Sequence, residues 1–257
     1  LDPPMHEFLP KDFQEIEILA TKLKKSPEKL VDRIESLQEN NPMLGHRGCR
    51  LGITKPEIYK MQTEAIFRSA IKLHQQGQEI KPEIMVPLIA DQKELEFIKN
   101  YLVQHIDQLF KQYDQEPFPY EIGTMIELPR ACLTADKLAE EADFFSFGTN
   151  DLTQMTYGFS RDDIGKFIGQ YKELEILPFD PFQMVDKEGV GELMKIAIRK
   201  ARQVKPNIPI GICGEVGGDP SSISFFQKIQ VTYVSCSPYR IPAARLAVAQ
   251  ATIQARS

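Results

Sequence analysis

The sequence lacks the features that mark several large classes of protein. Its 257 residues contain no apolar run of about 18 residues, the length that a membrane span requires. The first residues have no charged-then-apolar pattern of a secretory signal. Lysine and arginine are scattered along a chain of net charge −5, so the basic footprint of a nucleic-acid-binding protein is missing. We therefore expect a cytoplasmic protein that binds neither nucleic acid nor a membrane.

Cysteine is also scarce, and no two cysteines form a C-x-x-C pair. With no sign of secretion, we expect free thiols rather than zinc ligands or disulfides at Cys49, Cys132, Cys213 and Cys236. The chain begins LDPPMHEFLP without an initiating Met, and we interpret it as a piece of a longer polypeptide.

Short apolar runs alternate with longer amphipathic segments along most of the chain. With 42% hydrophobic and 26% charged residues, the composition suits one large domain rather than two small ones. The apolar runs have the near-continuous hydrophobic character of parallel strands that are covered on both faces. We expect strands at residues 83–89, 120–127, 143–148, 208–214 and 231–237.

Helices are expected between these strands. Ser26 and Pro27 are typical of a helix start, and Thr54 with Glu57 has the spacing of a capping box. Further helices are predicted at residues 91–113, 130–141, 189–204, 220–229 and 241–255. The stretch 156–187 is rich in Gly, Pro and Asp, which favours a long functional loop or lid.

This alternation predicts an α/β fold, for which two architectures are open. A doubly wound sheet would favour a G-x-G-x-x-G fingerprint, which the sequence lacks. A (β/α)₈ barrel builds its site from the carboxyl ends of several strands, and polar residues follow several of the expected strands. We therefore expect a TIM-type (β/α)₈ barrel that lacks its N-terminal strand or strands in this chain.

Carboxylates follow two of the expected strands. Glu127 ends one of them, and Asn150 and Asp151 follow another. Because neighbouring barrel strands bring their carboxyl ends to one mouth, these hard oxygen atoms would suit Mg²⁺ and leave coordination positions for water or substrate. Ordinary acidic residues of two surface loops are the alternative.

Three arginines are candidates for binding anionic groups. Arg47 and Arg50 lie in GHRGCR, and Arg161 follows Asp151 in the Gly-rich stretch. A guanidinium group offers a planar fork to phosphate or carboxylate oxygens. Ordinary salt bridges are the alternative for each of them.

Cys213 lies in GICGEVGGDP, where glycines surround a cysteine and a carboxylate, and three roles are open for it. Cys213 could pack as a small hydrophobe, or act as a nucleophile, although the nearby Glu215 disfavours a thiolate. As a thiol kept protonated by nearby negative charge, it could instead donate a proton. The acid-rich surroundings favour this third role.

Five long motifs, in this order, resemble the phosphoenolpyruvate-utilising enzymes, and among them the C-terminal domain of the pyruvate, phosphate dikinases. They are GHRGCRLGI, IGTMIELPRACLTAD, FFSFGTNDLTQMTYGFSRDD, GICGEVGGDP and YVSCSPYRIPAARLAVAQA. The resemblance covers essentially the whole chain. Phosphoenolpyruvate synthase and enzyme I of the sugar phosphotransferase system are relatives with a similar barrel and remain alternatives.

The resemblance implies that residues 1–257 are a barrel domain of a larger multidomain enzyme that interconverts phosphoenolpyruvate and pyruvate with Mg²⁺. Glu127 and Asp151 would be the metal ligands, and Cys213 would protonate the enolate and act as the base in reverse. The substrate-binding residues would be Arg47, Glu127, Gly148, Thr149, Asn150, Asp151 and Arg161.

The resemblance also implies partners. The phosphoryl group would move to or from a phosphohistidine on a separate domain, and an ATP-binding domain would belong to the same enzyme. Neither the G-G-x-T-S-H type motif nor the nucleotide domain occurs in this sequence, and the family's phosphate-binding arginine upstream of LDPP would precede Leu1. A family-like homodimer is expected. A Mg²⁺-dependent enolate lyase, or an inactive fragment that serves as a binding or dimerisation module, are the other functions left open.

Overall fold

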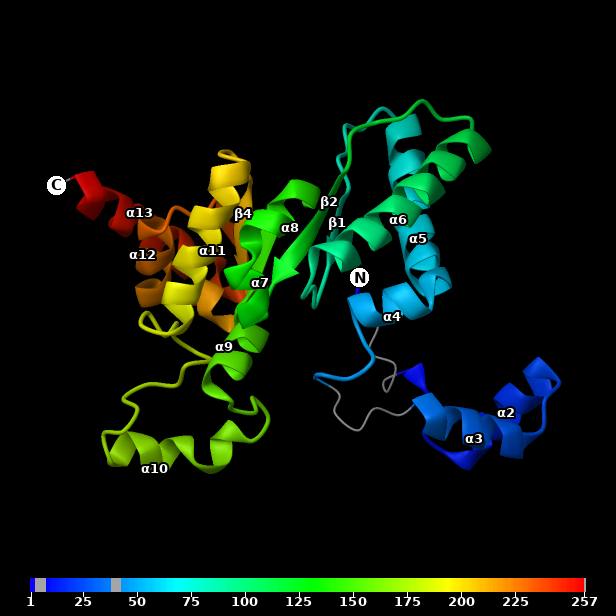
Figure 1. Cartoon of the computed structure of the whole chain (residues 1–257), viewed down its shortest axis with the longest axis horizontal. Coiled ribbons are helices and arrows are strands. Elements are labelled where there is room, and N and C mark those ends of the chain that lie inside the picture. Colours follow the sequence, from blue (N-terminus) through cyan, green and yellow to red (C-terminus); the bar gives the residue numbers. More distant parts are fainter. Residues whose placement is uncertain (3–7, 38–42, 257) are drawn as a thin grey trace.

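A five-stranded parallel sheet forms the centre of the molecule (Figure 1). The structure is a computed structural model that describes residues 1–2, 8–37 and 43–256. Within them, the strands pair in the order of the sequence. They are β1 (Glu83–Val86), β2 (Glu121–Ile126), β3 (Phe145–Gly148), β4 (Ile210–Cys213) and β5 (Tyr233–Val234).

Each strand coincides with one of the expected apolar runs, so the prediction of an α/β fold with a parallel sheet is confirmed. All four residues of β3 are buried, as a central strand covered on both faces requires. The order places β1 and β5 at the two ends of the sheet. The strands of the described residues therefore form an open sheet, and they do not by themselves confirm the expected closed barrel.

Helices connect the strands and cover the sheet. In the half of the molecule around β1, α5 (Pro56–Gln75) packs against α6 (Gln92–Gln112). On the other side, α11 (Val190–Val204) packs against α7 (Pro129–Leu133) and α8 (Ala135–Glu141). Over the described stretches of the chain, every helix falls short of the length or the hydropathy that crossing a membrane requires.

The C-terminal part of the chain adds a further pair of helices. After β4, α12 (Pro220–Lys228) begins at its N-cap Asp219, whose side chain accepts a hydrogen bond from Ser222 N. It packs against α13 (Ile241–Arg256), which ends the described chain. Both helices lie close to their predicted positions.

The start of α6 agrees with the helix predicted from the sequence, whereas the start of α5 does not agree with the predicted capping box. α6 begins after Asp91, which forms a capping box with Glu94. The predicted capping box of Thr54 is wrong. Thr54 is the last residue of α4 (Cys49–Thr54), and its hydroxyl donates to the carbonyl of Arg50 at 3.0 Å. The N-cap of α5 is Lys55, and no side chain caps that helix by a hydrogen bond.

The stretch 156–187 holds short helices rather than one long unstructured loop. It begins at the end of α9 (Thr149–Tyr157) and includes a 3₁₀ turn, η1 (Ile164–Lys166), and α10 (Ile168–Glu173). The segment projects from the body beyond α9 (Figure 1). Its aromatic rings pack on one another, with neighbouring centroids 5.1 to 6.4 Å apart, in a cluster of Tyr157, Phe159, Phe167 and Tyr171.

Two N-terminal helices form a hairpin that stands away from the sheet (Figure 1). They are α2 (Phe13–Leu23) and α3 (Pro27–Leu37), and the second starts at the predicted proline. The buried residues of the hairpin are Ala20, Leu30 and Ile34. The hairpin therefore contributes little to the core that supports the strand ends.

Candidate active site at the carboxyl ends of β2, β3 and β4

Glu127 is a buried carboxylate just beyond β2. It is 3% exposed, and its Oε1 accepts a hydrogen bond from the backbone N–H of Leu88 at 2.7 Å. Leu88 has a φ of 59°, a left-handed conformation that is costly for leucine. Gly148 leaves room for the carboxylate, because a Cβ there would lie 2.5 Å from Glu127 Oε2. The ends of β1 and β3 are thus both shaped around this side chain.

Asp151 lies in the first turn of α9 and is hydrogen-bonded to Glu127. Burial raises the pKa of Glu127, and the charge of Asp151 raises it further. Burial also raises the pKa of Asp151, although the hydrogen bond with Glu127 and the charge of Arg47 oppose that shift. Two buried carboxyl groups that are hydrogen-bonded to each other hold one proton between them unless a cation compensates their charge.

The two residues before Asp151 also belong to the site. Thr149 Oγ1 donates to the carbonyl of Cys213 at 2.7 Å, which links the end of β3 to the end of β4. Asn150 Oδ1 is buried and has no hydrogen-bond partner among the described residues. A buried amide oxygen without a partner is energetically costly, and a cation or a ligand donor would satisfy it.

Cys213 is the last residue of β4 and is partly exposed. Its Sγ donates to the carbonyl of Phe147 at 3.3 Å. Burial raises the pKa of Cys213; a hydrogen bond with Ser146 opposes the shift, and the charges of nearby carboxylates, Glu215 among them, add to it. The thiol is therefore protonated at neutral pH. Burial contributes more to this state than the nearby negative charge that the sequence suggested.

The glycines after Cys213 allow the strand ends to pack closely. Gly214 has a φ of 104°, and a Cβ there would lie 2.3 Å from Thr149 Oγ1. A Cβ on Gly217 would lie 2.2 Å from the carbonyl oxygen of Ser235. The backbone at Gly214 and Gly217 therefore passes close to α9 and to the end of β5, and a larger residue does not fit at either position.

These groups line one cavity of about 360 Å³, a volume within the range of small-molecule sites. The predicted residues that line it are Glu127, Gly148, Thr149, Asn150, Asp151 and Cys213. The lining residues that the sequence did not single out are Leu1, Asp2, Met85, Pro87, Met125 and Gly214. Met85 and Pro87 lie at the end of β1, so the rule that sites form at carboxyl ends of strands would have found them.

The three arginines have different positions. Arg47 forms an ion pair with Asp2 of the cavity wall, and its positive charge acts on the acidic pair. Arg161 lies outside the lining, where its Nη2 donates to Glu215 Oε1 at 2.6 Å. Arg50 Nη1 donates to two backbone carbonyls of the preceding turn, each at 2.9 Å. The structure thus brings Arg47 to the site, pairs Arg161 with Glu215, and gives Arg50 a structural role.

The acidic pair and its surroundings fit a hard cation. Within the described ranges, no group of three or more His, Cys, Asp and Glu side chains is arranged to hold a metal ion. Mg²⁺, however, is often bound through only one or two carboxylates and keeps several waters. Glu127 and Asp151 supply two such carboxylates, and the unpartnered Asn150 Oδ1 lies beside them. A cation here would compensate the buried negative charge.

The chain is similar to a known family over almost its whole length. The family model described as PEP-utilising enzyme, PEP-binding domain, matches residues 1–253. The pyruvate, phosphate dikinase of Clostridium symbiosum is 52% identical over 98% of this chain and 29% of its own length. The corresponding values are 53%, 100% and 28% for the dikinase of Rhizobium meliloti (strain 1021), and 52%, 98% and 29% for pyruvate, phosphate dikinase 2 of Zea mays.

Among solved structures, a citrate lyase from Burkholderia xenovorans LB400 has a TM-score of 0.42 and 15% identity over 65% of this chain and 48% of its own. That similarity is too low to bear on fold or function. The curated relatives are far closer in sequence, and the chain spans about 29% of the length of the first of them. From residue 1 to residue 253, the chain belongs to the PEP-utilising enzymes and corresponds to their PEP-binding domain.

Proposed function

We propose that this chain is the phosphoenolpyruvate/pyruvate half-site of a pyruvate, phosphate dikinase. The observation that carries the proposal is the convergence of Glu127, Asp151 and Cys213 on one cavity. The identity of 52% with the Clostridium symbiosum dikinase supports this enzyme over phosphoenolpyruvate synthase and enzyme I.

We also propose that residues 1–257 belong to a (β/α)₈ barrel domain of a larger enzyme. Parallel strands in sequence order with helices between them are the arrangement of such a barrel. Leu1 supports the proposal, because its amino group donates to the carbonyl of Met85 in β1 at 2.7 Å and its own carbonyl accepts from Tyr59 Oη at 2.7 Å. Leu1 thus lies along the edge of β1 where a further parallel strand of a barrel would pair.

Glu127 and Asp151 would hold Mg²⁺, with Asn150 beside them. The ion would supply positive charge against the enolate oxygen and the transferring phosphoryl group. For this the acidic pair must give up its shared proton, because carboxylates bind a cation in their ionised form. Arg47 would add a second positive group that neutralises substrate phosphate or carboxylate oxygens.

Cys213 would carry the proton transfer. When phosphoenolpyruvate passes its phosphoryl group to a histidine of another domain, the enolate of pyruvate remains. Its methylene carbon would take the proton from Cys213 Sγ, which forms the methyl group of pyruvate and leaves a thiolate that solvent reprotonates. In the reverse direction, the thiolate would remove a proton from that methyl group. A thiol whose pKa is raised by burial is neutral beforehand, as a proton donor must be.

The remaining predicted residues would position the substrate. Gly148 and Thr149 would place backbone close to it at the end of β3, together with the amide of Asn150. Arg161 would contact the substrate only after leaving Glu215, and an exposed ion pair of this kind is weak enough to exchange partners. The segment 156–187 would then close over the cavity as a lid.

The substitution Cys213→Ala in the intact multidomain enzyme tests the proposal. We expect it to abolish pyruvate formation while nucleotide-dependent phosphorylation of the carrier histidine continues. Cys236→Ala is the matched control, because Cys236 is also a partly exposed free cysteine but does not line the cavity. Loss of both partial reactions in a folded Cys213→Ala enzyme, or unchanged pyruvate formation, would contradict the role given to Cys213.

An inactive binding or dimerisation module is the competing function. Calorimetry with oxalate, an enolate mimic, and Mg²⁺ distinguishes this function from the phosphoenolpyruvate/pyruvate half-site. If the folded chain binds neither oxalate nor Mg²⁺, the inactive module is favoured. A homodimer is compatible with both. Leu246 and Ile253 of α13, which are 60% and 69% exposed, support one, and sedimentation of a Leu246→Glu variant would test it.

A further inference from the structure

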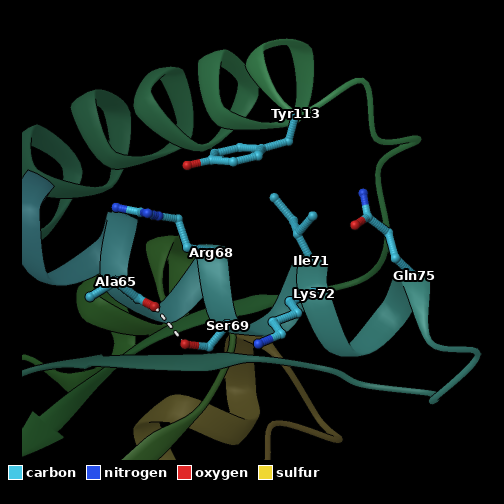
Figure 2. A pocket seen from close by; sticks show the side chains of 7 residues that line it. All are labelled: Ala65, Arg68, Ser69, Ile71, Lys72, Gln75 and Tyr113. Carbon is cyan, nitrogen blue, oxygen red and sulfur yellow. Dashed lines mark hydrogen bonds between the residues drawn. The ribbon is translucent and has the colours of Figure 1, made fainter.

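A second cavity, of about 520 Å³, lies between α5 and the end of α6 (Figure 2). Its walls come from successive turns of α5 and from Tyr113, the residue that follows α6. It shares no lining residue with the candidate active site. Its volume lies within the range of cavities that bind small molecules.

Two positively charged side chains belong to this cavity. Arg68 and Lys72 are one helical turn apart on α5 and therefore lie on the same face of the helix. In Figure 2, Arg68 extends towards the Tyr113 side of α5, and the end of Lys72 lies beside Ser69. Arg68 contacts Glu64 at 3.8 Å with 61% of its side chain exposed, which is a weak ion pair. Lys72 makes no ion pair with any residue that the structure describes.

The opposite wall is apolar and flat. The ring of Tyr113 lies across the cavity with a face turned towards α5 (Figure 2). Ile71, which is 2% exposed, and Ala65 line the α5 side. The Tyr113 hydroxyl makes no hydrogen bond within the described part of the chain. A planar apolar group packs favourably against an aromatic ring such as that of Tyr113.

The hydrogen bond of Ser69, another polar residue of the lining, limits which groups can bind a charged ligand. The Ser69 hydroxyl donates to the carbonyl of Ala65 at 3.0 Å, as the dashed line in Figure 2 shows. Its proton is thus already used, and the charge of a ligand would have to be met by the Arg68 guanidinium and the Lys72 ammonium. A phosphate group matches both, since guanidinium and ammonium groups are the usual partners of phosphate oxygens.

We propose that this cavity binds a small phosphorylated ligand with a flat apolar body, namely an aryl or nucleoside phosphate. The phosphate would bind the Arg68 guanidinium and the Lys72 ammonium, and the apolar body would lie against the ring of Tyr113. Inorganic phosphate would bind more weakly, because it leaves the apolar wall unused. Because the cations are exposed, salt would weaken binding. This proposal is independent of the function proposed for the strand-end cavity.

Titration of the chain with phenyl phosphate, adenosine monophosphate and inorganic phosphate, followed by residue-resolved amide NMR, tests the proposal. We expect saturable shifts at residues 65–75 and 113, with phenyl phosphate or adenosine monophosphate binding at least about fivefold more tightly than inorganic phosphate. Whichever of the two organic phosphates binds more tightly decides between an aryl and a nucleoside ligand. Oxalate with Mg²⁺ in the sample competes only for the strand-end cavity, so shifts near Glu127 alone would contradict this proposal and leave the other intact.

Substitutions distinguish binding at a specific site from nonspecific electrostatic attraction to surface cations. We expect Arg68→Ala/Lys72→Ala to weaken binding by about tenfold or more, and Tyr113→Ala to remove the preference for the organic phosphate. Lys195→Ala/Arg199→Ala is the matched control, because these exposed cations have the same spacing on α11. If the alanine pair unfolds the chain, Arg68→Gln/Lys72→Gln replaces it. Equal weakening by test and control pairs, or no saturable shift up to about 10 mM ligand, would overturn the proposal.

Discussion

The two cavities of this chain differ in the sign and in the burial of their charged side chains. The strand-end cavity, of about 360 Å³, buries two carboxyl groups, and the charge of Asp151 adds to the cost of ionising Glu127. The cavity beside α5, of about 520 Å³, presents Arg68 and Lys72 to solvent, where water and salt screen them. The smaller cavity therefore holds the stronger electrostatic interactions. Burial of charge, rather than volume, distinguishes a candidate catalytic site from a binding surface.

The largest difference between the two cavities is expected when Glu127 is substituted. Glu127→Gln removes one of the two proposed metal ligands while keeping the shape of the side chain. We expect Mg²⁺-dependent oxalate binding, measured by calorimetry, to weaken by at least about 100-fold, since even indirect supports of a metal site are worth roughly 10- to 100-fold. Arg68→Ala/Lys72→Ala should leave that binding unchanged. A weakening shared by both variants would break the distinction between the cavities.

The next effect concerns the space around the buried carboxylate. In Gly148→Ala, the added Cβ would lie 2.5 Å from Glu127 Oε2 and 2.6 Å from Met125 Sδ. We expect a loss of about 1–3 kcal/mol in the free energy of unfolding, typical of overpacking, as measured by urea denaturation. Gly169→Ala is the control, because a Cβ there meets no atom within 4 Å. Equal stability of the two variants would mean that β3 and Glu127 are not tightly packed.

The pH dependence of stability tests the burial of the acidic pair. Burial and Asp151 raise the pKa of Glu127 above its value of 4.5 in the unfolded chain, so the folded state binds more protons. The stabilising contribution is complete below pH 4.5 and is lost as the pH rises through the folded pKa.

Without divalent cations, we therefore expect the unfolding free energy from urea titrations to fall over that window. The fall should be smaller in Glu127→Gln and in wild-type chain with Mg²⁺. Parallel pH profiles for wild type and Glu127→Gln would show that this carboxylate does not carry the effect.

The smallest effect is expected for the ion pair at the rim. The Arg161 and Glu215 side chains are 46% and 45% exposed, so solvent screens them much as it screens Arg68. Glu215→Gln should change the unfolding free energy by no more than about 1 kcal/mol. If urea denaturation shows that the unfolding free energy falls by more than about 2 kcal/mol, this ion pair is as strong as a buried interaction, contrary to the prediction.

Much of the fold could be predicted because hydrophobic pattern follows burial. The five apolar runs contain the five strands of the described residues, and the helix expected at residues 91–113 corresponds to α6. Thr54 shows the limit of such signals: α4 continues up to this residue, and its hydroxyl donates to the carbonyl of Arg50 within that helix, whereas the sequence pattern predicted that it would start the next one. The glycine- and proline-rich stretch predicted a loop, but aromatic packing of Phe159 and Phe167 supports short helices there.

The sequence predicted which residues form the candidate site better than it predicted which of their side chains are in contact. The carboxyl-end rule placed Glu127, Asp151 and Cys213 at strand ends, and these residues line one cavity. The same rule could not place Arg161, because a long exposed side chain chooses among several partners. Its contact with Glu215 depends on how the segment after α9 folds back.

The parallel α/β fold and the kinds of side chain that follow each strand could be predicted from the amino-acid sequence, since both depend on local pattern and chain order. Tertiary structure alone decided the electrostatics. The register that pairs Gly148 with Cys213 sets which groups meet, and the depth of burial makes the acidic pair share a proton. The α5 cavity likewise exists only because packing of α6 on α5 brings Tyr113 over Arg68 and Ile71. Distance and desolvation, which set the strength of charge interactions, are properties of the folded chain.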